Sequence, residues 1–212
     1  MRILPGVIFI GLFVFCSCKP WDKKPTVTAN KAVRQDSIFI QPFDDMDDNT
    51  LQFVATNLQK VYKLKTKILP LRKLPANAYY PARHRYLADS LLRFLLPLSG
   101  NNRNYIMGVT GKDISTKHNG QANWGIMGLG FTPGNSCIIS DYRLQAYPKT
   151  RETIDTQLLK VAIHELGHNL GLSHCPDTAC YMADAGGKNV LDQEHGFCKT
   201  CTLYLQSKDL LN

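Results

Sequence analysis

After residue 36 the chain alternates between short apolar runs and longer stretches in which apolar residues recur at helical spacing. The short runs predict β-strands at residues 37–43, 65–71, 105–110, 124–131 and 136–140. The helical spacing predicts a helix over residues 49–62, capped by Asp48 or Asn49, and another over residues 83–96. The irregular glycines within 124–131 predict a strand that another backbone approaches closely.

A third helix is predicted from Thr150 to about Leu170, and its pattern differs from that of the other two. Glu152 and Asp155 favour a helix start there, since acidic side chains stabilise the amino end of a helix. Its apolar residues spread round most of the circumference: Ile154, Leu158, Val161, Ala162, Ile163, Leu166 and Leu170. A helix that is apolar on nearly all sides is a buried one. We therefore expect this helix to lie in the core.

The end of the same helix carries a metal-binding pattern. The residues that form H-E-x-x-H-x-x-G-x-x-H are His164, Glu165, His168, Gly171 and His174. Two histidines four residues apart project from one helix face and can bind one ion, and the glutamate can lie over a water on that ion. The glycine allows the chain to turn back, so that the third histidine approaches the metal. Three imidazoles with an open fourth position are the ligands of a catalytic zinc.

Four of the seven cysteines form two close pairs, Cys175 with Cys180 and Cys198 with Cys201. Two such pairs separated by a short segment suit a tetrahedral zinc site with four thiolate ligands. Two disulfides are the alternative, because the N-terminal sequence predicts export. Cys137 lies within a predicted strand, and we expect it to be a buried core thiol.

Residues 1–17 predict a signal peptide of the bacterial lipoprotein type. The first two residues are followed by an uncharged run, and the small Ser17 directly precedes Cys18. In such a signal Cys18 becomes the lipid-bearing first residue of the mature protein. An uncleaved membrane anchor, or cleavage at Cys16, is the alternative.

The rest of the chain divides into a tether and one domain. Residues 18–35 contain prolines, several lysines and no apolar periodicity, which predicts a flexible tether. Residues 36–212 are long enough to bury the core of a single domain. We therefore expect a monomeric protein held to a membrane by its lipid in the bacterial cell envelope, with the periplasmic or outer side left open.

The charge of the chain does not predict a nucleic-acid partner. The formal net charge is +8 over 212 residues, and many of the cations fall between Lys60 and Arg93. They are interleaved with apolar residues and form no aromatic–basic motif. A solvated face is expected here, rather than a surface that binds nucleic acid or an anionic membrane.

The segment His164–Cys175, followed by Cys180–Met182 and by Cys198–Cys201, resembles the signature of the archaemetzincins. In that family the first of four cysteines directly follows the third histidine. The resemblance continues upstream in three further segments: Leu74–Arg83, Gly108–Asp113 and Ile139–Leu144. Together these segments cover the chain from about Ser37 to its end.

This resemblance implies an α+β, metzincin-like domain with a twisted mixed β-sheet, a buried active-site helix and a small zinc-stapled C-terminal part. It also implies a zinc peptidase that acts on peptide or protein substrates, with Glu165 as the base and Met182 as the Met-turn. Two zinc ions per chain are implied, with these ligands: His164, His168 and His174 for the catalytic ion, and Cys175, Cys180, Cys198 and Cys201 for the structural one. The alternative function is a non-catalytic, zinc-stabilised module that binds peptides or proteins.

Overall fold

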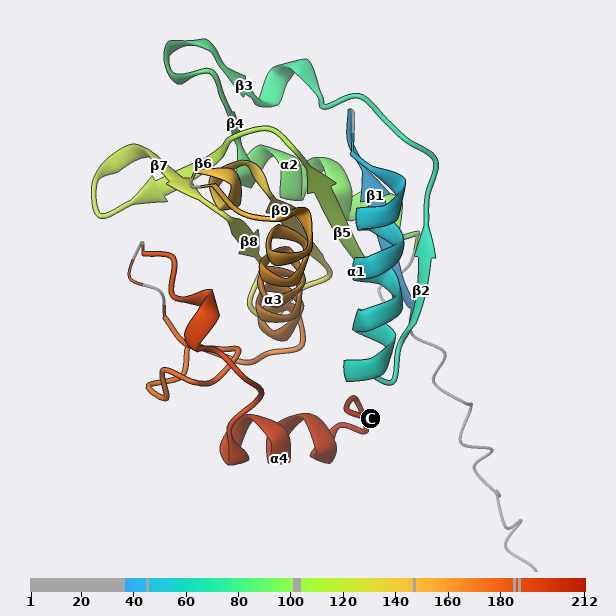
Figure 1. Cartoon of the computed structure of the whole chain (residues 1–212). Coiled ribbons are helices and arrows are strands. Elements are labelled where there is room, and N and C mark those ends of the chain that lie inside the picture. Colours follow the sequence, from blue (N-terminus) through green and yellow to red (C-terminus); the bar gives the residue numbers. More distant parts are fainter. Residues whose placement is uncertain (1–36, 45, 101–103, 147, 185, 187) are drawn as a thin grey trace, which may run out of the picture. The chain divides into compact units, whose positions relative to one another are not determined.

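The computed structural model describes residues 37–212 except 45, 101–103, 147, 185 and 187 (Figure 1). The predicted signal peptide, the tether and the lipidation site at Cys18 therefore lie outside the described residues. From residue 37 onward the described chain belongs to one unit, which spans Gln35–Asn212.

The larger of two sheets has five strands in the order β2-β1-β5-β9-β8. The first four strands run parallel, and β8 is antiparallel to β9. Strands β5 and β9 are buried along their whole length because they lie inside the sheet, between layers of helices. The strands are β1 (Ser37–Pro42), β2 (Lys65–Ile68), β5 (Tyr105–Thr110), β8 (Gly128–Gly130) and β9 (Ser136–Ser140).

The smaller sheet has four strands in the order β3-β4-β6-β7. They are β3 (Tyr79–Tyr80), β4 (Arg85–Leu87), β6 (Ile114–His118) and β7 (Gln121–Ile126). The predicted strand over residues 124–131 is wrong in one respect, because it is divided between the two sheets. Its first half belongs to β7 and its second half is β8, with Met127 between them.

Successive residues of the larger sheet face two different helical layers. Helices α1 (Asp48–Val61) and α3 (Arg151–Asn169) share one core cluster with these sheet residues: Ile38, Ile40, Met107, Val109, Cys137 and Ile139. Helix α2 (Ala88–Leu95) lies on the other face and shares a second cluster with Ile106 and Ile138. Figure 1 shows α1 and α3 on one face of the larger sheet and α2 on the other. The period-two alternation of the strands therefore divides the core into two layers. Cys137 is fully buried, which confirms the predicted core thiol.

Two of the three predicted helices begin at other residues than the sequence predicted. The N-cap of α1 is Asp47, one or two residues before the predicted Asp48 or Asn49, and its carboxylate accepts a hydrogen bond from the backbone N–H of Thr50 at 3.0 Å. The helix predicted over residues 83–96 is wrong in its first turn, where β4 pairs with β6 in the smaller sheet. The buried helix is confirmed: Thr150 caps α3, which ends at Asn169.

The residues after α3 form a small part with helix α4 (Lys199–Ser207), which the apolar pattern did not predict. Isolated backbone bridges pair Cys175 with Ala183 and Cys180 with Gly196. Short 3₁₀ turns connect the elements of the fold: η1 (Ala76–Ala78), η2 (Pro81–Arg83), η3 (Leu96–Ser99), η4 (Tyr142–Gln145) and η5 (Leu191–Gln193).

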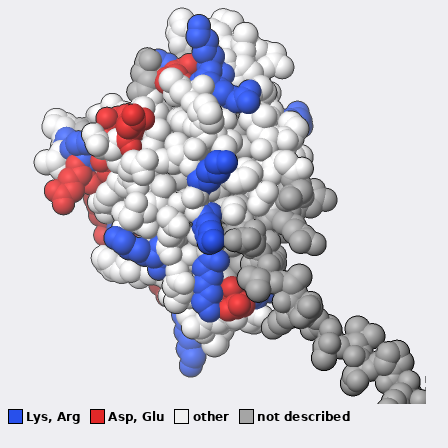
Figure 2. Space-filling model, turned by 90° about the vertical axis from the view of Figure 1, so that its right-hand side faces the viewer, with Lys and Arg blue, Asp and Glu red and all other residues white. Residues whose placement is uncertain are grey.

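The cations between Lys60 and Arg93 are mostly exposed, and Figure 2 shows lysine and arginine side chains spread over one face of the molecule. Arg85 differs, since it is only partly exposed and lines a cleft.

Among the described residues, no helix combines the length and the hydrophobicity that crossing a membrane requires.

Candidate metal centre and active-site cleft

Helix α3 places two motif histidines on one face. The Nε2 atoms of His164 and His168 are 3.0 Å apart. The helix ends at Asn169, and Gly171 takes a φ of +99°, a left-handed conformation that turns the chain back. His174 therefore returns to the same point, and ligand atoms of the three histidines all lie within 4.8 Å of one another.

The Nδ1 atoms of two of these histidines fix the orientation of their rings. Nδ1 of His164 lies 2.7 Å from the carbonyl oxygen of Tyr181, and Nδ1 of His168 lies 2.8 Å from that of Leu172. A carbonyl oxygen only accepts, so each Nδ1 donates its proton. Both Nε2 atoms are then acceptors that face each other, and neither can donate to the other. A cation between them satisfies both lone pairs, and imidazole nitrogens are common zinc ligands.

Burial keeps two of the histidines in the neutral form that binds metal. Burial and the neighbouring His168 lower the pKa of His164 to about 4. Burial also lowers the pKa of His168. Since an imidazole must be deprotonated to bind a metal ion, both side chains are ready ligands at neutral pH.

Glu165 is a buried acidic group beside these histidines. Only 7% of it is exposed, and burial raises the pKa of its carboxyl group to about 8. A Cβ atom at Gly128 would lie 2.6 Å from Oε1 of Glu165, and one at Gly130 would lie 2.8 Å from its backbone oxygen. The glycines therefore allow β8 to lie directly against α3, which confirms the close backbone approach predicted from the sequence.

Met182 lies against the same helix. It is fully buried, and a Cβ atom at Gly167 would overlap its Sδ. Its carbonyl oxygen accepts a hydrogen bond from the backbone N–H of Cys175 at 2.7 Å. Met182 therefore connects the helix that carries the histidines with the segment that carries the cysteines.

A cleft of about 1220 Å³ runs past the histidines. Strands β7 and β8 line it, and among the described strands each is the last one of its sheet. Helix α3 lines it through Val161, His164, Glu165 and His168. The cleft therefore combines a possible metal site, a buried carboxyl group and strand edges that can accept an extended chain.

The cleft also contains a group of ionised side chains that we did not predict as a site. The carboxylate of Asp113 is 2.6 Å from Nε of Arg85 and 2.8 Å from Nε of Arg143. Asp113 and Arg143 fall within two of the upstream segments that resemble the archaemetzincins. This resemblance is the sequence signal that could have identified them as site residues. The partners are 28 and 30 residues apart, so no local spacing predicts that they meet.

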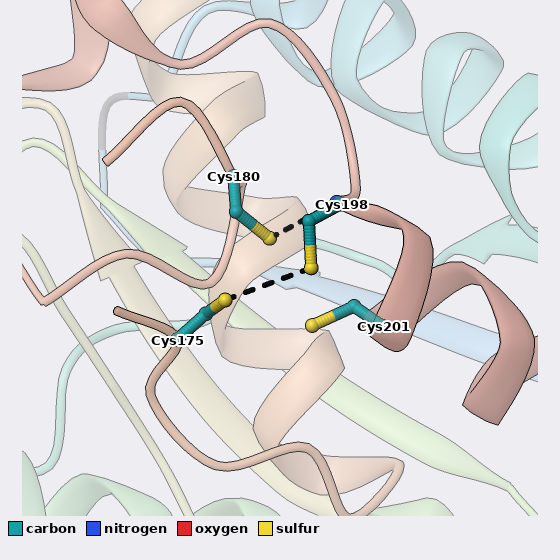
Figure 3. Close-up of side chains that lie close together, drawn as sticks. All are labelled: Cys175, Cys180, Cys198 and Cys201. Atoms are coloured by element: carbon teal, nitrogen blue, oxygen red, sulfur yellow. Dashed lines mark hydrogen bonds between the residues drawn. The ribbon is translucent and has the colours of Figure 1, made fainter. Parts of the chain in front are cut away.

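The four C-terminal cysteines converge on one point, and Figure 3 shows their sulfur atoms turned toward one another. These Sγ atoms all lie within 4.8 Å of one another, and the thiols are free. Sγ of Cys175 is 3.6 Å from Sγ of Cys198, a contact that joins the two sequence pairs. Four sulfurs around a common centre fit a four-thiolate metal site.

Backbone N–H groups point at these sulfurs. Sγ of Cys180 accepts from the N–H of Met182 at 3.4 Å and from that of Cys198 at 3.3 Å. A hydrogen bond from the backbone of Cys201 lowers the pKa of the Cys198 thiol to about 7, whereas burial raises the pKa of Cys201. Donors aimed at sulfur favour the thiolate, which is the form that binds zinc.

A buried helix with H-E-x-x-H, a third histidine after a glycine turn and a strand edge over the cleft define a zinc metallopeptidase of the metzincin type. Residues 27–207 match the model of peptidase family M54. The chain belongs to this family, that of the archaemetzincins.

Known archaemetzincins are similar to this chain over most of their length. The protein of Archaeoglobus fulgidus is 30% identical over 165 residues, which are 77% of this chain and 95% of that protein. The crystal structure of the Methanopyrus kandleri protein matches with a TM-score of 0.71 and 27% identity, covering 83% of this chain and 96% of that one. The crystal structure of the A. fulgidus protein, complexed with malonate, matches with a TM-score of 0.68 and 28% identity, covering 79% and 99%. These matches confirm the predicted family and α+β fold class.

Proposed function

We propose that the protein hydrolyses peptide bonds at a catalytic zinc site formed by His164, His168 and His174. One observation carries this proposal: the half-buried imidazoles of His164 and His168 both donate Nδ1–H to carbonyl oxygens, so their Nε2 lone pairs face each other 3.0 Å apart. The third histidine completes the ligand set and leaves a coordination position open. When bound, zinc polarises the carbonyl group of the substrate and lowers the pKa of a water.

Glu165 is the proposed general base. Its carboxylate accepts a proton from the attacking water and then donates a proton to the leaving amine. Burial alone raises its pKa to about 8, which would leave much of it protonated at neutral pH. Positive charge at the histidine site favours the carboxylate, so the base form depends on an occupied metal site.

The substrate is proposed to bind as an extended chain along the edge of β8. Backbone hydrogen bonds to an edge strand hold a peptide without regard to its sequence. Gly128 and Gly130 bring this strand onto Glu165, so a peptide paired there passes the catalytic carboxylate. Met182, packed under α3, is proposed as the Met-turn that supports the histidine site.

Exchange of Glu165 for glutamine tests the catalytic proposal. The variant keeps the three histidines, so we expect it to retain metal and to lose peptide hydrolysis by about 10²-fold or more. The matched control is Glu152→Gln, which alters an exposed glutamate in the first turn of the same helix and should leave activity unchanged. Metal content and cleavage of a diverse peptide library are the measurements. A metal-loaded wild type that cleaves none of the peptides contradicts the proposal and supports a binding module.

We further propose that the cysteine site holds a structural zinc, which gives two zinc ions per chain. The support is the convergence of four free thiols and the N–H groups aimed at Cys180. A structural site of this kind has four closed protein ligands and adds its binding free energy to folding.

The cellular location is proposed from the N-terminal sequence alone. Residues 1–17 would be removed as a lipoprotein signal, and residues 18–35 would tether a monomeric peptidase domain (36–212) to a membrane of the bacterial envelope through lipidated Cys18.

A further inference from the structure

We propose that Arg143, held in position by Asp113, binds a carboxylate of the substrate in the active-site cleft. The inference rests on the proposed peptidase function and deepens it, because it states which charge on a peptide the cleft selects.

The ionised group at this position carries a net positive charge. Nε and Nη2 of Arg143 contact the two oxygens of Asp113 at 2.8 and 3.0 Å. Nε of Arg85 contacts the same carboxylate at 2.6 Å, and its Nη1 donates to the carbonyl oxygen of Asn123 at 2.8 Å. Two guanidinium groups share one carboxylate, so one positive charge is not neutralised within the group.

Arg143 and Asp113 both line the cleft, and the cation is the more exposed of the two. The side chain of Arg143 is 31% exposed, whereas that of Asp113 is 9% exposed. Arg143 uses Nε and Nη2 for the ion pair, which leaves Nη1 to donate to a ligand. Among the described residues that line the cleft, the exposed acid is Asp184, which lies 3.7 Å from His174 and therefore near the metal site.

The position of this guanidinium along the strand edge matches the reach of a substrate side chain. A Cβ atom at Gly125 would overlap the guanidinium of Arg143, so the missing side chain lets it lie against β7. Gly128, three residues further on, lies against Glu165. Three residues span at most about 10 Å, and the bend at Met127 between β7 and β8 shortens this separation. A substrate side chain two or three residues from the scissile bond can therefore reach Arg143.

A purely structural role is the competing explanation, in which the ion pair only ties η4 to the start of β6. That role predicts a less stable variant but no discrimination between substrates. Selectivity between matched peptides therefore separates the two explanations, whatever happens to stability.

The test compares peptides that differ only by glutamate or glutamine at one of three positions on either side of the scissile bond. We expect the metal-loaded wild type to prefer glutamate at one position by about tenfold in kcat/KM, mainly through KM, because a charge-assisted hydrogen bond forms only with the carboxylate. Arg143→Gln should reduce this preference to within about twofold, and Arg143→Lys should retain part of it because the charge remains. Arg151→Gln is the matched control, since Arg151 is also paired with carboxylates, those of Asp141 and Asp155, but does not line the cleft.

A binding measurement makes the test independent of turnover. Fluorescence anisotropy of the same labelled peptides, measured on protein that also carries Glu165→Gln, should show the same preference in Kd and its loss with Arg143→Gln. Equal affinities for both peptides at every position, or a preference that survives Arg143→Gln, would overturn the inference. If the wild type binds the acidic peptide selectively but cleaves nothing, the proposed peptidase function fails while this inference stands.

Discussion

Glu165 combines burial in the cleft wall with an ionisable group, so its protonation contributes to the stability of the metal-free protein. Its pKa rises from about 4.5 in the unfolded chain to about 8 in the folded one. Below pH 4.5 both states are protonated and no penalty arises. Between these two values the unfolded state loses its proton first, so the free energy of unfolding decreases as pH rises.

This linkage predicts the effect of Glu165→Gln on the metal-free protein. Glutamine does not ionise, so the variant should be more stable than the wild type at pH 8, by on the order of a few kcal/mol. The difference should shrink as the pH falls to about 4, below the pKa of the unfolded chain, where the wild-type carboxyl is mostly protonated in both states. Thermal unfolding of both proteins at the two pH values, after a chelator has removed only the ion at the histidine site, measures it. A difference in Tm that does not change with pH would show that burial does not hold the carboxyl protonated.

At the scale of elements, the junction after α3 decides whether the third histidine reaches the site. Gly171 has a φ of +99°, which side chains disfavour, and a Cβ atom there would lie 2.5 Å from the hydroxyl oxygen of Tyr204 on α4. The same hydroxyl donates to the carbonyl oxygen of Leu170 at 3.3 Å. The turn therefore depends on both the backbone conformation and the packing of α4.

We expect Gly171→Ala to lower the free energy of unfolding by about 1–3 kcal/mol and to speed the loss of zinc, because His174 shifts with the turn. Gly120→Ala is the control: that glycine also has a positive φ of +82°, but a Cβ atom there would have no neighbour within 4 Å. Thermal unfolding and the rate of zinc transfer to a chelator are the measurements. Equally fast zinc loss in both variants would mean that the turn does not position the ligand.

At the scale of the whole molecule, the two proposed metal sites belong to one continuous segment. Cys175 directly follows His174, and its backbone N–H donates to the carbonyl oxygen of Met182. Few large apolar side chains are buried between Cys175 and Cys201. This part therefore needs a metal ion or disulfides to be stable.

The proposal of two zinc ions predicts two different labilities. A chelator should first remove the ion at the open histidine site, abolishing activity with the fold intact, and should then unfold the C-terminal part as the cysteine site empties. Cys198→Ser should lower the zinc content to one per chain and destabilise the protein. Metal analysis together with a free-thiol count on anaerobically purified protein measures both. One zinc per chain, with the four sulfurs paired as disulfides, would contradict the proposed structural zinc site.

The proposed lipid anchor predicts a defined mature N-terminus. Mass spectrometry of the membrane fraction should show a peptide that begins at a diacylated or triacylated Cys18. An intact Met1 in that fraction would support the uncleaved anchor instead, and a lipid on Cys16 would move the cleavage site by two residues.

The sequence by itself determined the features that depend on neighbours along the chain. Strands β5 and β9 and the buried helix α3 were predicted because a periodic apolar pattern reports which sides of an element are covered. The convergence of three histidines was predictable because one helical turn and one glycine turn set their spacing.

Only the tertiary structure decided the features that depend on distant partners. Residues 85–87 form a strand because β6 pairs with them, although their own pattern suits a helix. The division of residues 124–131 at Met127 arises because β7 and β8 pair with strands of different sheets. The ion pairs of Asp113 with Arg85 and Arg143 join three segments that are far apart in the chain: strand β4, the residue before β6 and the turn η4. Local periodicity carries no information about such partners, because pairing and charge contacts are fixed only when the whole chain has folded.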